Sequence, residues 1–178
     1  MTGSRDTVIF VEINTISIMK NTRHIFVQVD TESVLRENPY PTAPVSVCEH
    51  SLIYDQGSMA LGNAVTNFIV DANSDQTIHF TILPLKLFSF HKLYFKDFTA
   101  VVKEGQMEIP TKIDLREQPL SFSIFLGAAS KNSVAVFTLG ATLEFEIVTK
   151  DGKREKLEME IVIDPVLRAN QGTIHSEK

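Results

Sequence analysis

The stretch Leu143-Glu144-Phe145-Glu146-Ile147, then Lys150-Asp151-Gly152-Lys153, then Leu157-Glu158-Met159-Glu160-Ile161 decides the fold class of this chain. Apolar and polar residues alternate on both sides of the turn, with the period of a β-strand that buries one face. Asp-Gly between two alternating runs is a strong hairpin signal, because both residues tolerate positive φ angles. We therefore predict an antiparallel hairpin whose apolar face lies in a core.

The other face of this hairpin is rich in glutamate. Its members are Glu144, Glu146, Glu158 and Glu160. Like charges on adjacent strands repel each other modestly. A solvated surface is the plain interpretation, and an acidic docking surface for a basic partner is the alternative.

The same β period recurs along most of the chain, with turn residues about every 8–12 residues, as in a sandwich or barrel. The strand candidates are Val8–Ile13, Ile16–Met19, His24–Val29, Val45–Cys48, Ser51–Tyr54, Val65–Val70, Thr77–Leu83, Tyr94–Val102, Gln106–Ile109, Leu120–Leu126, Val134–Leu139, Thr142–Thr149 and Lys156–Ile163. We predict an all-β, antiparallel β-sandwich of about eight to eleven strands. Residues 1–165 would form one domain, and residues 166–178 a polar C-terminal tail.

Helical signals are short. Glu32–Asn38 predicts about two turns, capped by Thr31 and stopped by Pro39. Val166–Asn170 predicts a single turn after Pro165. The three prolines of Asn38–Pro44 require an extended or turning loop.

Composition narrows the class of protein. Apolar residues make up 43% of the 178 residues, which is enough for one substantial core. The formal net charge of −5 argues against a nucleic-acid-binding surface, which needs a basic excess. Cys48 is the single cysteine, so no internal disulfide forms, and the N-terminus lacks the apolar core of a signal peptide. We expect a soluble protein of a reducing compartment, the cytoplasm.

One apolar stretch, Leu83–Phe95, lies where a sandwich normally turns and where polar residues are the rule. It is either a buried strand behind a kink at Pro84 or a surface loop that contacts an apolar partner. The candidate binding residues in it are Leu85, Lys86, Leu87, Phe88, Phe90, His91 and Lys92.

Sequence patterns for catalysis and for cofactors are missing. No glycine-rich nucleotide motif, nucleophile elbow or His-Glu-x-x-His occurs. Cys48-Glu49-His50 reads as a buried thiol near a strand end, because a catalytic cysteine normally takes its histidine from elsewhere in the fold. His79 reads as a half-exposed strand histidine, and Asp71–Asp75 is too short for an EF-hand. We predict no catalytic residue, no metal ligand and no cofactor.

A resemblance to C2 domains rests on spacing. Asn38-Pro39-Tyr40 before a strand resembles the Asp-Pro-Tyr of C2 domains, and Asn67–Val70, Thr77–Ile82 and Tyr94–Val102 are similar to successive C2 strands. The resemblance implies a C2-like sandwich. Leu83–Phe95, which would be a calcium-binding loop in that family, contains no Asp or Glu. It therefore implies a calcium-independent member that binds proteins or, less often, lipids.

The sequence predicts a non-catalytic protein-interaction or scaffold module with a protein partner. A peripheral membrane-binding domain is one alternative, in which the apolar side chains insert and Lys86, His91 and Lys92 lie at headgroup level. A jelly-roll-type assembly protein that forms homo-oligomers is the other.

Overall fold

Strands with one apolar and one polar side form two sheets, whose apolar sides face each other across a shared core. The computed structural model describes residues 22–39, 42–57, 60–63, 69–86, 90–115, 117, 119–164 and 166–170. Within these residues there are twelve strands, one α-helix and one 3₁₀ turn. The predicted all-β sandwich is confirmed. The number of strands is just above the expected eight to eleven, because several short strands are included.

The first sheet has the strand order β4-β3-β1-β6-β9. The strands are β1 (Thr22–Val29), β3 (Ser51–Asp55), β4 (Ala60–Asn63), β6 (Gln76–Pro84) and β9 (Ser121–Leu126). β1 is antiparallel to β3 and parallel to β6. β6 is antiparallel to β9. This pairing brings residues that are far apart in the sequence side by side on the sheet.

The second sheet is built around β10 (Ser133–Val148). β7 (Lys92–Glu104) pairs along one edge of β10, and β11 (Arg154–Ile163) followed by β12 (Val166–Asn170) pairs along the other. The short outer strands are β2 (Val45–Ser46) on β11, β5 (Ile69–Asn73) on β12 and β8 (Lys112–Asp114) on β7. The pairings β2–β11 and β5–β12 are parallel, like β1–β6, while the other pairings are antiparallel.

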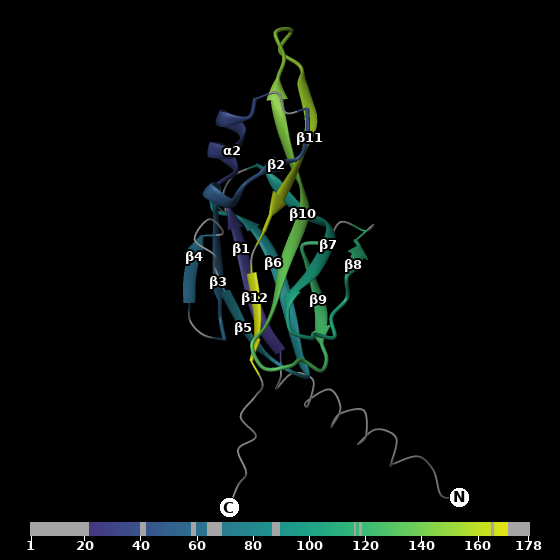
Figure 1. Cartoon of the computed structure of the whole chain (residues 1–178). Coiled ribbons are helices and arrows are strands. Elements are labelled where there is room, and N and C mark those ends of the chain that lie inside the picture. Colours follow the sequence, from purple (N-terminus) through teal and green to yellow (C-terminus); the bar gives the residue numbers. More distant parts are fainter. Residues whose placement is uncertain are drawn as a thin grey trace, which may run out of the picture.

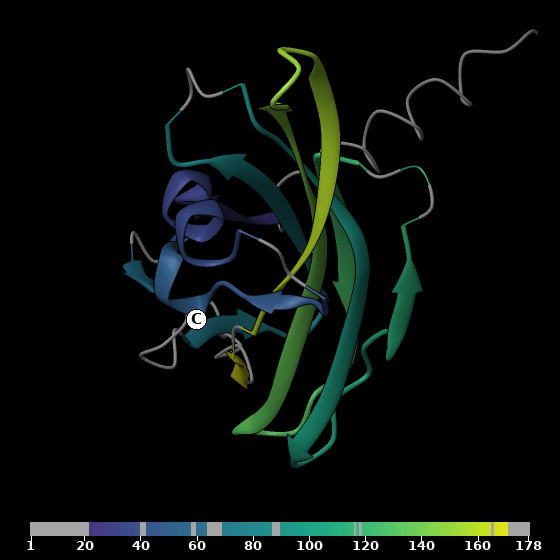
Figure 2. The ribbon, with the colours of Figure 1, turned by 90° about the horizontal axis from the view of Figure 1, so that it is seen from above.

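A cluster of five phenylalanines joins the two sheets. Phe80 and Phe122 come from the first sheet, and Phe95, Phe98 and Phe137 from the second. The Phe95 and Phe122 rings meet edge to face at 4.8 Å between centroids, and Phe98 lies 5.1 Å from Phe137. Seen from above in Figure 2, the two sheets form two layers. The five phenylalanines belong to the hydrophobic core that both sheets share.

The helix α2 (Thr31–Glu37) lies at the end of the sandwich where the β10–β11 hairpin leaves it (Figure 1). Its cap differs from the expected one. Asp30 is the N-cap and accepts hydrogen bonds from the Ser33 amide (3.3 Å) and hydroxyl (2.8 Å), whereas Thr31 is buried inside the first turn. Asp30 takes this role because it directly follows β1 and leaves its carboxylate beside the free amides.

Two further expectations about the C-terminal half are wrong. Val166–Asn170 is strand β12 and not a helical turn, so the sandwich extends past residue 165. Pairing with β10 and β5 overrides the local helical signal of Pro165. Val134–Leu139 and Thr142–Thr149 form one continuous strand, β10, which passes a bulge at Gly140, where an added Cβ would meet the Asp97 carboxylate.

Smaller differences concern strand limits. β4 was not expected, and of Gln106–Ile109 only Met107 forms an isolated bridge, to Ala129. Cys48 belongs to the 3₁₀ turn η1 (Cys48–His50). Within Asp71–Asp75, only Ser74 and Asp75 form a turn, because Asp71 lies in β5. Val8–Ile13, Ile16–Met19 and residues 65–68 lie outside the described residues.

We predict that the core depends on β10 far more than on the sheet margin. Leu139→Ala, at a fully buried position, should lower the free energy of unfolding by about 2–5 kcal/mol, because it leaves a cavity between the sheets. Leu120→Ala, at a mostly exposed position beside β9, should change it by less than about 0.5 kcal/mol. Urea denaturation of both variants measures the difference, and equal losses would contradict this view of the core.

Candidate interaction site

The β10–β11 hairpin continues beyond the sandwich as a two-stranded ribbon. β7 accompanies β10 only as far as Glu144, which lies opposite Lys92, and β2 accompanies β11 only at Ile161 and Val162. We call Phe145–Leu157 the arm. Within the described residues, its strands pair only with each other, and Figure 1 shows it reaching beyond the other strands at the top of the view.

The arm exposes apolar side chains on both of its faces. Ile147 and Leu157 are exposed on the face that continues the core side of the sheet. Val148, which is 70% exposed, lies on the opposite face, together with Glu146 and Arg154. A ribbon that projects from the body cannot bury both faces against its own chain, so these side chains are available to another molecule.

The four predicted glutamates are interleaved with cations. Lys92 Nζ and Lys156 Nζ both lie 3.5 Å from Glu144 Oε1, and Arg154 lies 3.8 Å from Glu146. Lys96 pairs with Glu160, and this hydrogen bond raises the pKa of Lys96. The four glutamates and these four cations carry no net charge, so the face is a solvated mosaic without an acidic excess, and each exposed pair contributes little stability.

The apolar segment, defined as Leu85–Phe90, connects the two sheets. β6 ends at Pro84 and β7 begins at Lys92, so the alternative of a buried strand through this segment is wrong for its described residues. Leu85 is partly exposed and Phe90 is 92% exposed. Leu87 and Phe88 lie outside the described residues. The surface-loop alternative is the one that the described residues support.

Contacts with β1 and α2 hold the segment at both ends. The Leu85 amide donates a hydrogen bond to the Val29 carbonyl (2.7 Å), and Lys86 forms an ion pair with Glu32. At the other end, His91 Nδ1 lies 2.8 Å from the buried Thr31 hydroxyl. These contacts fix where Phe90 enters solvent.

The arm and the apolar segment meet in one hollow of about 470 Å³. Its lining residues are Phe90, His91, Lys92, Glu146, Val148 and Arg154. The apolar segment and Glu146 of the glutamate face, which the sequence offered as separate candidates, therefore share one site. Val148 and Arg154 were not predicted, although the alternation does place an apolar Val148 on the polar face of the hairpin.

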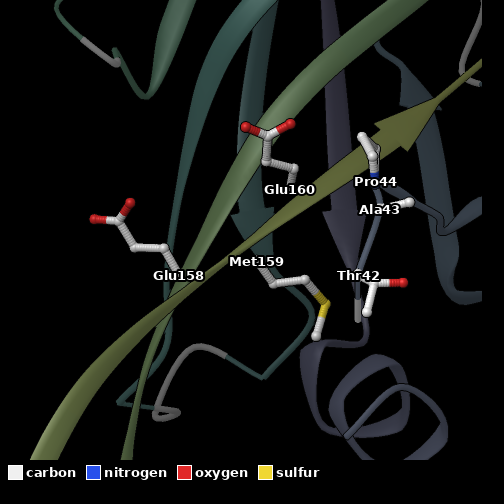
Figure 3. Close-up of a pocket in the computed structure, with 6 residues that line it drawn as sticks. All are labelled: Thr42, Ala43, Pro44, Glu158, Met159 and Glu160. Atoms are coloured by element: carbon white, nitrogen blue, oxygen red, sulfur yellow. The ribbon is translucent and has the colours of Figure 1, made fainter. Parts of the chain in front are cut away.

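Glu158 and Glu160 also border a smaller groove of about 230 Å³, next to Thr42–Pro44. Figure 3 shows Met159 projecting toward Thr42, while Glu158 and Glu160 project to the other side of the strand. Met159 is almost fully buried. The groove is shallow, and its floor belongs to the core.

The thiol and imidazole of Cys48 and His50 do not form a pair. His50 Nε2 lies 2.9 Å from Glu37 Oε2, and Cys48 is half-buried beside it. Both border an open hollow of about 620 Å³ that also contains Glu49 and Asp164. Among the described residues, no three His, Cys, Asp or Glu side chains come together as metal ligands. The same part of the chain contains no helix that is long and apolar enough to cross a membrane.

Fold and site together define a β-sandwich with a projecting, partly apolar hairpin. Its fold is similar to that of an inclusion body protein (PixA) from Burkholderia cenocepacia, with a TM-score of 0.52 and 12% sequence identity over 84% of this chain and 95% of that one. No protein-family model matches the chain, and no curated protein sequence matches it. At this identity the similarity concerns the fold.

We predict that Thr31 holds the apolar segment in place. Thr31→Val keeps the shape of the side chain but removes the hydrogen bond to His91. Amide exchange at Phe90 and His91 should become several-fold faster, while the free energy of unfolding falls by only about 1 kcal/mol. Thr99→Val, a half-buried threonine of β7, serves as the control. Unchanged exchange at both amides would show that Thr31 does not anchor the segment.

Proposed function

We propose that this protein is a non-catalytic assembly module whose arm and apolar segment dock onto another copy of the chain. The observation that carries the proposal is the pair Phe90 and Val148. Both are large apolar side chains, 92% and 70% exposed, and both border one hollow. Exposed apolar residues that gather on a rigid scaffold are typical of protein contact sites.

The anchoring of the apolar segment favours binding. Association costs free energy when loops and side chains become ordered. The hydrogen bond from the Leu85 amide to Val29 and the hydrogen bond between His91 and Thr31 already restrict the chain on both sides of Phe90. The charged residues around the hollow are mostly paired with one another, which suits the polar rim of an interface.

The similar solved structure supports this proposal in a limited way. It is the structure of an inclusion body protein, and its fold covers most of this chain. A sandwich with a projecting arm offers a surface for contacts between copies. For this chain, the structural or assembly role is a proposal that the fold similarity supports.

Other features of the sequence fit the same role. As a C2-like sandwich, the chain would be of the calcium-independent type, because Leu83–Phe95 carries no carboxylate. We propose a cytoplasmic location, which suits a protein with one free, half-buried cysteine.

Membrane binding is less well supported by the surroundings of Phe90. Lys86 pairs with Glu32 and Lys92 with Glu144, so these cations are partly neutralised by their own chain. A basic residue contributes only about 1 kcal/mol at an anionic surface even when it is free. The net charge of −5 opposes such attraction further.

We predict that the full chain self-associates through the arm. Phe90→Ser combined with Val148→Ser should weaken association roughly tenfold or more, because it removes the apolar contact of the hollow. Sedimentation velocity over a concentration series measures the change. Val101→Ser, which changes an exposed valine on β7 outside the site, should behave like the unmodified chain.

Two outcomes would contradict the proposed function. One is a chain that stays monomeric at the highest accessible concentration. The other is co-sedimentation of the chain with phosphatidylcholine–phosphatidylserine vesicles that the double variant abolishes, which would favour a membrane partner.

A further inference from the structure

In the described strands of the first sheet, the outward-facing positions include no carboxylate, lysine or arginine. Alternation places the core-facing residues at Ile25, Val27, Ile78 and Phe80, so their neighbours in sequence face outward. Within the described strands, the outward residues are Thr22, His24, Phe26, Gln28, Leu52, Tyr54, Leu61, Thr77, His79, Thr81, Leu83, Ser121, Ser123 and Phe125. The second sheet, by contrast, carries seven charged side chains in ion pairs along its arm and neighbouring strands.

This uncharged face, as we call it, carries aromatic side chains. Phe26 stacks on Tyr54 with ring centroids 6.2 Å apart, and Tyr54 pairs in register with Leu61 on β4. Leu61 and Phe125, at the two margins, are 66% and 55% exposed. In a chain with 22% charged residues, it is unusual that the outward sides of five adjacent strands carry no carboxylate, lysine or arginine, and such a surface suits contact with another protein.

Two histidines lie next to each other at its centre. β1 and β6 are parallel and in register, so His24 lies opposite His79, and their rings meet edge to face at 5.3 Å. His79 Nδ1 is 2.8 Å from the Ser123 hydroxyl. Partial burial, and secondarily the charge of His24, lower the pKa of His79.

Among the residues that the structure describes, the groups around the pair offer no compensating negative charge. Directly after β3, Gln56 is the neighbour of His24, and on β9 the neighbour of His79 is Ser123. The nearest charged residues on these strands, Arg23 and Asp55, lie on the opposite side of the sheet and form an ion pair with each other. Protonated imidazoles on this face would therefore repel each other without a carboxylate to offset them.

We propose that the uncharged face docks onto the same face of a second copy, and that protonation of His24 and His79 opens this contact. The proposal rests on the assembly function proposed above but uses a different surface. Two copies that each carry a net charge of −5 repel each other. When two copies meet through the uncharged face, no charged side chains of the described first-sheet strands are brought close to each other.

The size of the face is adequate for a weak, specific contact. Five strands about 4.8 Å apart and about 20 Å long cover roughly 500 Å² in each copy. Two such faces bury roughly 1,000 Å², which is the lower limit for a specific interface. A two-fold axis through the centre brings the histidine pairs of both copies together, so that up to four imidazoles share one buried region.

The direction of the pH dependence follows from this arrangement. Burial at the contact disfavours the charged imidazole, so the dimer binds fewer protons than two separate chains. Association is then strongest above the ordinary histidine pKa of 6.5 and is lost as the pH falls through and below it.

The experiment uses the full chain with the arm disabled by Phe90→Ser and Val148→Ser. Sedimentation equilibrium at about pH 7.5 should still find a discrete dimer, and its dissociation constant should rise at least tenfold at about pH 5.5. Adding His24→Gln and His79→Gln should preserve the dimer and remove the pH dependence. Adding Thr81→Lys, at the centre of the face, should abolish the dimer, whereas Thr138→Lys on the outer side of β10 should not.

Circular dichroism confirms that each variant is folded. A monomer at pH 7.5 in the arm-disabled chain would overturn the inference, and so would a dimer that persists with Thr81→Lys or ignores pH. These results leave the proposed function intact if the unmodified chain still forms larger species through the arm. If the unmodified and arm-disabled chains associate equally strongly, the arm is not an assembly contact. The proposed contact through the uncharged face would then still stand.

Discussion

The contact between the phenylalanines of the two sheets is the constraint on which the remainder of the structure depends. Phe80 and Phe122 can meet Phe95, Phe98 and Phe137 only if the apolar sides of both sheets face inward. A shift of any of these strands by one residue would turn a ring from the core into solvent. The register of β6, β7, β9 and β10 is therefore fixed by packing, and every surface feature follows from that register.

β10 transmits this constraint to the site. β7 and β12 pair with the first part of β10, and β7 and β11 pair with its second part. The pairing with β7 stops at Glu144, opposite Lys92, because β7 begins at Lys92. Beyond that point the strand continues with β11 as its only described partner. The arm is therefore rigid at its base and exposed at its tip, which places Val148 beside Phe90.

The two sheets distribute charge in opposite ways. The outer side of the second sheet alternates lysine, arginine and glutamate, which protects its margins from unwanted strand pairing. The outer side of the first sheet carries hydroxyl, amide, aromatic and imidazole groups. If both proposed contacts exist, each copy has two distinct surfaces, and two surfaces per copy allow an assembly to grow beyond a closed dimer.

The sequence by itself determined the β class, the final hairpin and most strand positions, because the alternation of side chains along a strand is a local property. It did not reveal that Lys92 and Lys96 neutralise the hairpin glutamates, that Val166–Asn170 joins the sheet, or that Phe90 and Val148 share a hollow. It gave no sign that His24 lies beside His79. These features depend on which strands become neighbours, and strand order is set by packing between residues that are distant in the chain.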